Sequence, residues 1–343
     1  MRWTRAVPSS WRRYWSGGRA PRKRVRIVEV GPRDGLQNER VITTGDKVRL
    51  IEQLAVGAGL RTVEVGSFVS AKRVPQMADT GELWRQLQGV LPSKVLERMQ
   101  LPVLVPNERH LERALEVGCR EVAVFVSASE GFSVANLGCS IAESLQRVER
   151  VFQRIAELHE LLRPRVRAYV SCVFECPYDG PVKPEAVAQV AQQLLRMGCY
   201  EVSLGDTIGV GTPGSVMRLL DTLLEGDAAT AHPYAVHFHD TFGTALANIE
   251  CAIREYGIAV VDSAVGGLGG CPFAPGSSGN VATEDVVYML RGMNALEEPV
   301  DLNALVRIGV WANGLFGRGT RSRVAQAMTS RSAAATQPAA VSH

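Results

Sequence analysis

Two histidines, His237 and His239, lie two residues apart at the end of a short apolar run in the segment 236–243. Residues i and i+2 of a β-strand point to the same face, so the two imidazole rings are directed at one point. Neutral imidazole is a ligand for most divalent first-row metals. The pair indicates either a divalent-metal site or two hydrogen-bonded structural histidines, and other residues must decide between these interpretations.

Other polar residues with catalytic or ligand chemistry follow other apolar segments of the chain. They are Arg33 and Asp34 in the run Gly31–Gly35, Glu64, Asp206 with Thr207, and Cys271, Asn280 and Glu284 in or after the glycine-rich segment 266–279. These residues are far apart in the sequence. They form one site only if the fold brings the elements that carry them together.

Eight short segments rich in β-branched residues are predicted strands. They are residues 25–30, 61–65, 101–105, 121–126, 165–172, 200–204, 234–238 and 259–265. Helical patterns separate most of them, as at residues 47–58. Ser140 and Glu143 form a capping box, and Pro184 and Pro213 lie where first helical turns begin. Eight alternating units of strand and helix predict an α/β fold, a (β/α)8 TIM barrel with parallel strands.

Active sites of such barrels are built at the C-terminal ends of the strands. The loop Gly31–Gly35 follows the first predicted strand, and Glu64 lies near the end of the second. Asp206 follows the sixth strand, and the two histidines end the seventh. We therefore expect these residues to converge on one mouth of the barrel.

Composition excludes several classes of function. Of 343 residues, 46% are hydrophobic and 21% charged, as in a soluble globular protein, and no apolar run approaches the roughly 20 residues of a membrane span. Nine Arg and Lys residues lie between Arg2 and Arg26, so the rest of the chain has 38 − 9 = 29 basic and 35 acidic residues, formally −6. A nucleic-acid partner is not expected. Seven cysteines without a C-x-x-C pair indicate reduced thiols.

The chain divides into three parts. Residues 1–22 contain Arg, Ser and Trp but no acid, which is typical of a mitochondrial transit segment; a disordered basic arm or an extended bacterial start is the alternative. Residues 23–328 are the predicted barrel with C-terminal helices. Residues 329–343 are a predicted disordered tail. The predicted location is the mitochondrial matrix, or the cytoplasm if the chain is bacterial.

Three segments carry a resemblance to a known family. They are V-E-V-G-P-R-D-G-L-Q-N-E at 28–39, V-H-F-H-D-T-F-G-T-A-L-A-N at 236–248, and G-L-G-G-C-P-F-A-P-G-S-S-G-N-V-A-T-E-D at 267–285. Together they resemble 3-hydroxy-3-methylglutaryl-CoA lyases, over roughly residues 22–328. The R-D-G-x-Q and H-x-H motifs also occur in a wider group of metal-dependent barrels, whereas G-L-G-G-C-P-F resembles the lyase loop specifically.

The resemblance implies an activity and a site. The reaction is a retro-Claisen cleavage of (S)-3-hydroxy-3-methylglutaryl-CoA, an acyl-CoA, to acetoacetate and acetyl-CoA, by an enzyme expected to be a homodimer. A divalent cation, Mg²⁺ or Mn²⁺, is expected on Asp34, His237, His239 and Asn280. The expected catalytic residues are Arg33, Cys271, Glu64 and Asp206. Arg33 stabilises the negative charge on the thioester oxygen, and Cys271 protonates the acetyl carbanion. Glu64 and Asp206 take part in proton transfer. The expected substrate contacts are Arg33, Gln37 and Thr207, with Asn136 and Ser140 near the CoA; Glu284 is expected to orient Asn280 and Arg33.

Alternatives remain open at this point. A Claisen-type condensing enzyme of the same barrel group would join acetyl-CoA to a 2-keto acid with the same metal and arginine. The run Gly267–Gly270 is a poor match to a dinucleotide-binding loop, because the full G-x-G-x-x-G register is missing. A binding protein without catalysis would not need the intact polar set. Asp206 is also a candidate cap for the turn that follows it.

Overall fold

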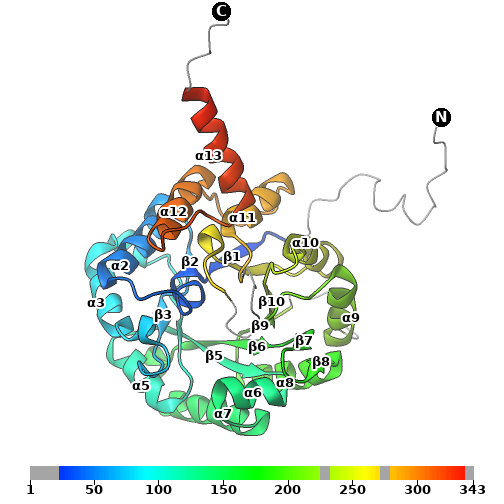
Figure 1. Ribbon diagram of the computed structural model, residues 1–343. Coiled ribbons are helices and arrows are strands. Elements are labelled where there is room, and N and C mark those ends of the chain that lie inside the picture. Colours follow the sequence, from blue (N-terminus) through cyan, green and yellow to red (C-terminus); the bar gives the residue numbers. More distant parts are fainter. Residues whose placement is uncertain (1–22, 225–231, 271–278, 337–343) are drawn as a thin grey trace, which may run out of the picture.

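The computed structural model of the protein describes residues 23–224, 232–270 and 279–336. In these ranges a nine-stranded parallel sheet has the order β2-β1-β11-β10-β9-β6-β5-β4-β3. Helices surround this curled sheet (Figure 1). Its strands are β1 Arg26–Glu29, β2 Thr62–Val63, β3 Gly66–Ser67, β4 Val103–Leu104, β5 Glu121–Ser127, β6 Arg165–Ser171, β9 Glu201–Asp206, β10 Tyr234–Phe238 and β11 Val260–Ser263.

The barrel closes through one extended segment, residues 62–67, which contains both β2 and β3. β2 pairs with β1, and β3 pairs with β4. Between the two short strands, Glu64 N donates to Glu29 O at 2.9 Å and Val65 N donates to Pro102 O at 3.0 Å, so the segment contacts both neighbours along its length. β2 and β3 together form one of eight barrel strands. The predicted TIM barrel is confirmed, and β10 has the predicted bounds.

Twelve α-helices lie within the described ranges. They are α2 Thr44–Glu52, α3 Thr80–Val90, α4 Ser93–Leu96, α5 Glu108–Glu116, α6 Glu130–Leu137, α7 Ile141–Ala156, α8 Pro184–Met197, α9 Pro213–Leu223, α10 Ala245–Tyr256, α11 Thr283–Gly292, α12 Leu302–Gly314 and α13 Arg323–Thr336. The capping box of Ser140 and Glu143 begins α7, and proline occupies the first turn of α8 and of α9. These three predictions are confirmed. A π-helical turn, η2 (Gln53–Gly57), continues α2, so the predicted helix at 47–58 has two parts.

Alternate residues of β6 point to different sides of the sheet. Val166, Ala168 and Val170 belong to the apolar core between the sheet and the helices. Arg167 and Tyr169 point into the barrel, where they contact side chains of other strands. Successive side chains of a strand alternate between faces, so the sequence V-R-A-Y-V places an apolar face outward and a polar face inward. The inside of this barrel therefore carries charge close to the site.

The last helix ends later than the sequence predicted. α13 packs against α11 and α12 and continues to Thr336, past Thr329, where a disordered tail was expected to begin (Figure 1). Alanine has the highest helix propensity, and the segment 333–335 is three alanines, which favours continuation of the helix. No helix in the described part of the chain is long and apolar enough to cross a bilayer.

Candidate active site

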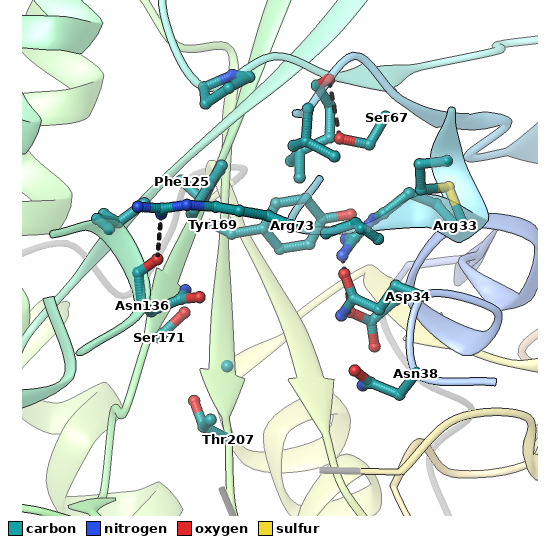
Figure 2. A pocket seen from close by; sticks show the side chains of 18 of the residues that line it. Arg33, Asp34, Asn38, Ser67, Arg73, Phe125, Asn136, Tyr169, Ser171 and Thr207 are labelled. Carbon is teal, nitrogen blue, oxygen red and sulfur yellow. Dashed lines mark hydrogen bonds and ion pairs between the residues drawn. The ribbon is translucent and has the colours of Figure 1, made fainter. Parts of the chain in front are cut away.

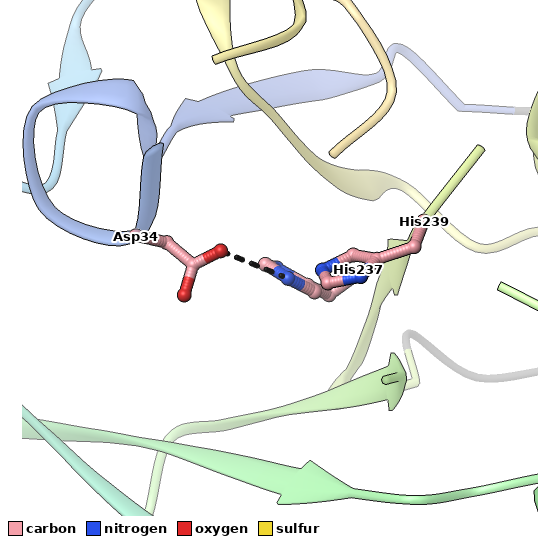
Figure 3. A group of neighbouring side chains, drawn as sticks. All are labelled: Asp34, His237 and His239. Atoms are coloured by element: carbon pink, nitrogen blue, oxygen red, sulfur yellow. Dashed lines mark ion pairs between the residues drawn. The ribbon is translucent and has the colours of Figure 1, made fainter. Parts of the chain in front are cut away.

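Three side chains converge at the C-terminal end of the barrel. Asp34 lies on η1 (Gly31–Gly35), directly after β1, while His237 lies on β10 and His239 follows it. One possible ligand atom from each residue lies within 4.8 Å of the other two, and His237 Nε2 is 3.8 Å from Asp34 Oδ2. Figure 3 shows the three side chains pointing toward one another. The predicted convergence of the first and seventh strand ends is confirmed.

The protonation of this cluster fits a cation. Burial raises the pKa of the Asp34 carboxyl, but Arg33 and the two histidines outweigh burial and lower it to about 2. Burial and the neighbouring His237 lower the pKa of His239 to about 4, which keeps that ring neutral. Its buried Nδ1 has no hydrogen-bond partner among the described residues. A carboxylate and two imidazoles suit a divalent metal, and the orphaned nitrogen of His239 supports that use.

Asn280 lies beside this cluster. It forms an antiparallel bridge with His239, and its Nδ2 donates to Asp34 Oδ2 at 2.8 Å and to Leu268 O at 3.3 Å. Two backbone elements, the strand end after β10 and the segment before α11, thus bring a carboxamide next to the carboxylate. This position fits the predicted role of Asn280 as a fourth ligand.

Arg33 is held rigidly in the wall of the site. Its Nε donates to Glu64 Oε2 and its NH1 donates to Asp34 Oδ1, both at 2.7 Å. The guanidinium carbon lies 5.0 Å from the centre of the Tyr169 ring. Burial lowers the pKa of Arg33, but the charges of Glu64 and Asp34 outweigh burial and raise it. The site therefore contains a permanent, oriented positive charge beside the candidate metal ligands.

Glu64 is a second unusual carboxylate. It is fully buried, and its Oε2 accepts from Tyr169 OH at 2.9 Å as well as from Arg33. Its buried Oε1 has no hydrogen-bond partner among the residues described. Burial raises the pKa of Glu64 although Arg33 opposes the shift. A carboxyl with a raised pKa beside an active-site arginine agrees with the predicted role in proton handling.

A cavity of about 910 Å³ opens onto these residues. Figure 2 shows Arg33 and Asp34 on one side of it and Asn136 on the other. The predicted site residues that line it are Arg33, Asp34, Gln37, Asn136, Thr207, His237 and His239. Gln37 Nε2 also donates to Asp34 Oδ1 at 2.7 Å. Arg73 and Arg147 also line the cavity. Arg73 NH1 donates to Asn136 O and Arg147 NH1 donates to Leu137 O, so both positive charges lie beside α6.

With this geometry established, comparison with known proteins shows the family. Residues 24–310 match the HMGL-like family. The chain belongs to this family. Its membership confirms the resemblance read from the three sequence segments, and the barrel described above is the fold of its solved members.

Relatives across the family cover nearly the whole chain. The 3-hydroxy-3-isohexenylglutaryl-CoA/hydroxy-methylglutaryl-CoA lyase of Pseudomonas aeruginosa is 50% identical over 313 residues, which are 90% of this chain and 98% of that protein. The mitochondrial hydroxymethylglutaryl-CoA lyase of Bos taurus is 49% identical, over 89% of this chain and 90% of that protein. A crystal structure of the P. aeruginosa lyase has a TM-score of 0.82 at 49% identity, over 90% and 98% of the two chains.

A further solved structure of an HMG-CoA lyase, from Acinetobacter baumannii, contains coenzyme A and 3-methylmalate. It is 32% identical to this chain, with a TM-score of 0.79, and covers 88% of this chain and 94% of that one.

Three predicted site residues of this HMGL-like protein have local hydrogen-bond partners. Ser140 caps α7 and does not line the cavity. Asp206 accepts from Val210 N at 3.2 Å and from Gly211 N at 2.8 Å, the turn-capping role left open above, while burial raises its pKa to about 6. Glu284 accepts from Gly266 N at 2.8 Å and does not contact Asn280 or Arg33. The prediction that Glu284 orients these two residues by direct contact is therefore wrong.

Cys271 lies outside the described residues. The residue bonded to it, Gly270, lines the cavity, and Gly270 O accepts from Asn38 Nδ2 at 2.8 Å. Beyond the undescribed segment, Asn280 contacts Asp34. The described residues Gly270 and Asn280, which lie on either side of this segment in the sequence, therefore both contact residues of the site.

Four buried residues near the site were not predicted: Glu29, Arg167, Tyr169 and Asp262. Glu29 accepts from Gly31 N at 2.8 Å and from Val265 N at 2.9 Å, and so connects the loop of Asp34 with the start of the glycine-rich segment. A Cβ on Gly31 would lie 2.5 Å from Glu29 Oε1, so this contact requires glycine. The available signal was an ionisable residue within an apolar strand segment, as in V-R-A-Y-V and V-V-D-S.

Proposed function

We propose that this protein cleaves 3-hydroxy-3-methylglutaryl-CoA to acetoacetate and acetyl-CoA. The observation that carries the proposal is the convergence of Asp34, His237 and His239 with a buried arginine in one large cavity. Relatives about 50% identical over nearly the whole chain are named as lyases of this substrate, which supports the same reaction here.

Asp34, His237, His239 and Asn280 would hold the divalent cation, Mg²⁺ or Mn²⁺. When bound, it would lower the pKa of the substrate's tertiary hydroxyl and favour loss of that proton. The carboxylate and the amide oxygen are hard ligands that suit either ion, and the two imidazoles fix the direction of binding.

Residues of the chain carry out the remaining steps, which are charge stabilisation and proton transfer. The hydroxyl carbon becomes the ketone of acetoacetate as its bond to the α-carbon of the thioester breaks, and the electron pair moves into the thioester enolate. The Arg33 guanidinium, fixed by Glu64 and Asp34, meets the charge that grows on the thioester oxygen. Cys271 delivers a proton to the α-carbon, which releases acetyl-CoA. Glu64, which accepts from Arg33 and whose pKa is raised by burial, is the proposed acceptor of the proton lost by the hydroxyl.

The far end of the cavity is the proposed binding region for the CoA part of the substrate. Asn136 lines the cavity on α6, and Arg73 NH1 donates to its backbone oxygen at 3.4 Å. Arg73 and Arg147 place two positive charges there, which complement phosphate groups. The A. baumannii relative with bound coenzyme A supports this class of ligand.

The direct test is an assay of purified protein with Mg²⁺ and 3-hydroxy-3-methylglutaryl-CoA. Acetoacetate and acetyl-CoA should appear in equal amounts. If neither forms, while acetyl-CoA and a 2-keto acid yield a condensation product, the protein is a condensing enzyme and the proposed function is wrong.

Loss of a metal ligand gives the next prediction. His239→Ala should weaken Mn²⁺ binding and lower turnover by at least about 10- to 100-fold, because even supporting residues of metal sites have effects of that size. Calorimetric titration with Mn²⁺ measures the affinity without substrate. His110→Gln is the matched control: His110 lines the same cavity, but it is outside the cluster and should bind Mn²⁺ like the parent. Equal affinity in both variants would return His239 to a structural role.

Mitochondrial location is proposed from the basic, acid-free residues 1–22. A chain that starts at Arg22 should keep the activity and melting temperature of the full chain, because the family match begins at residue 24. In a eukaryotic cell, residues 1–25 fused to a fluorescent protein should direct it to mitochondria. Diffuse fluorescence would favour the cytoplasmic alternative, and unfolding of the shortened chain would contradict a separate leader.

A further inference from the structure

Asp262 lies on β11, next to the strand that carries His237, and points into the barrel behind the candidate metal cluster. One carboxylate oxygen, Oδ2, lies 3.2 Å from His237 Nδ1. The other ring nitrogen, Nε2, faces Asp34 Oδ2 at 3.8 Å. Asp262 is 1% exposed and does not line the cavity. Asp262 therefore contacts His237, a candidate metal ligand, from the side away from the cavity, and it does not itself reach the substrate.

Three hydrogen bonds, two from Arg167 and one from Ser203, fix the position of this carboxylate. Arg167 NH2 donates to its Oδ1 at 2.6 Å, and Arg167 NH1 donates to its Oδ2 at 3.1 Å. Ser203 Oγ donates to Oδ2 at 2.8 Å. Arg167 is itself anchored, because its Nε donates to Glu201 Oε1 at 2.6 Å. These contacts join β6, β9 and β11, so the carboxylate has little freedom to move.

The chemistry of this contact sets the state of His237. An ionised carboxylate only accepts hydrogen bonds, so His237 Nδ1 must carry the hydrogen. In the neutral ring, Nε2 then has the lone pair, and that lone pair faces Asp34. We propose that Asp262 is a positioning residue, which with Arg167 and Ser203 fixes the tautomer and the ring orientation of His237 so that Nε2 is ready to bind the cation.

The second histidine of the pair differs in this respect. The backbone of Thr207 contacts the His239 ring. The Nδ1 atom of His239 has no hydrogen-bond partner in the ranges that the structure describes. Among the described residues, no carboxylate contacts the His239 ring as Asp262 contacts that of His237. Buried carboxylates on metal-binding histidines typically contribute 10- to 100-fold to metal affinity or activity. The inference rests on the proposed metal site, but its test does not require substrate.

The test uses Asp262→Asn, which keeps the size of the side chain but introduces an amide that can donate to Nδ1. In metal-free parent protein at about pH 8, where an ordinary histidine is neutral, ¹⁵N NMR should find His237 as the Nδ1–H tautomer. The variant should shift toward Nε2–H and bind Mn²⁺ about 10- to 100-fold more weakly. Unchanged ring signals with parental Mn²⁺ affinity would overturn the proposal.

Glu121→Gln is the matched control, because Glu121 is another buried strand carboxylate, but it accepts from Tyr200 OH and contacts neither Arg167 nor Asp262 nor His237. It should lower the melting temperature but leave the tautomer and the Mn²⁺ affinity of folded protein unchanged. If Asp262→Asn does not fold, Ser203→Ala removes only one hydrogen bond to Oδ2 and should give the same shift in weaker form. A parent that binds no Mn²⁺ would refute the proposed metal centre, while the tautomer measurement still tests Asp262.

Discussion

Replacing Arg33 with glutamine is expected to lower turnover of 3-hydroxy-3-methylglutaryl-CoA by about 10²- to 10³-fold, the usual effect of removing one preorganised donor to a developing oxyanion. The loss should appear equally in kcat and kcat/KM, because charge on the thioester oxygen grows only toward the transition state. Mn²⁺ affinity should change much less, since the predicted ligands all remain. Steady-state kinetics and calorimetric titration on one preparation measure both.

Because Arg33 forms buried ion pairs, Arg33→Gln should also lower the stability of the fold, and this effect must be separated from the effect on turnover. Removing one partner of a buried ion pair typically costs about 3–5 kcal/mol, and Glu64 is fully buried. The double variant Arg33→Gln/Glu64→Gln removes both charges and should recover stability but not turnover. Arg85→Gln, in an exposed pair with Glu82, is the control and should match the parent in both. A double variant with recovered turnover would show that Arg33 only stabilises the fold.

The barrel was predictable because its signal is periodic. β-branched segments recur with helices between them, and each predicted segment contains all or most of an observed strand. The division of the second strand into β2 and β3 was not predictable. It depends on how residues 62–67 contact two neighbours at once, and that geometry exists only after closure. The hairpin of β7 (Glu175–Cys176) and β8 (Gly180–Pro181) was missed for a related reason, since two-residue strands carry no period.

The candidate metal site was predictable because parallel strands end at one mouth. Asp34 and His237 come from strands that are distant in the sequence but adjacent to β11 on either side. Carboxylates near these ends were harder to assign, because backbone amides offer hydrogen bonds to any of them. Asp206 and Glu284 bind such amides. Ser140 had two predicted roles, and the capping box is the one that the structure confirms.

The polar interior of the barrel could not be derived from sequence patterns. Arg167 and Asp262 are 95 positions apart, yet their side chains meet at 2.6 Å. Each alone resembles a charged residue on a solvated strand face. Only the register of β6, β9, β10 and β11 turns both to the same side and places them behind His237.

Replacement of Cys271 is the second change expected to lower turnover strongly. If its thiol protonates the acetyl carbanion, Cys271→Ala removes a proton donor but no metal ligand. Turnover should fall by about 10²- to 10⁴-fold, the range for a positioned acid or base, while Mn²⁺ and coenzyme A bind as in the parent. Iodoacetamide should inactivate the parent, and bound substrate should slow that reaction, because the reagent and the substrate would compete for the same cavity.

Cys139→Ala is the matched control for this variant. Cys139 and Cys271 each directly follow a glycine that lines the cavity, Gly138 and Gly270, and Cys139 itself is buried. A structural cysteine loses packing when it becomes alanine, so Cys139→Ala should lower the melting temperature and keep parental turnover per folded molecule. Cys271→Ala should show the opposite pattern. If it melts earlier but turns over substrate at the parental rate, Cys271 is structural and the protonating acid must be another residue, with Glu64 first to be tested because burial raises its pKa.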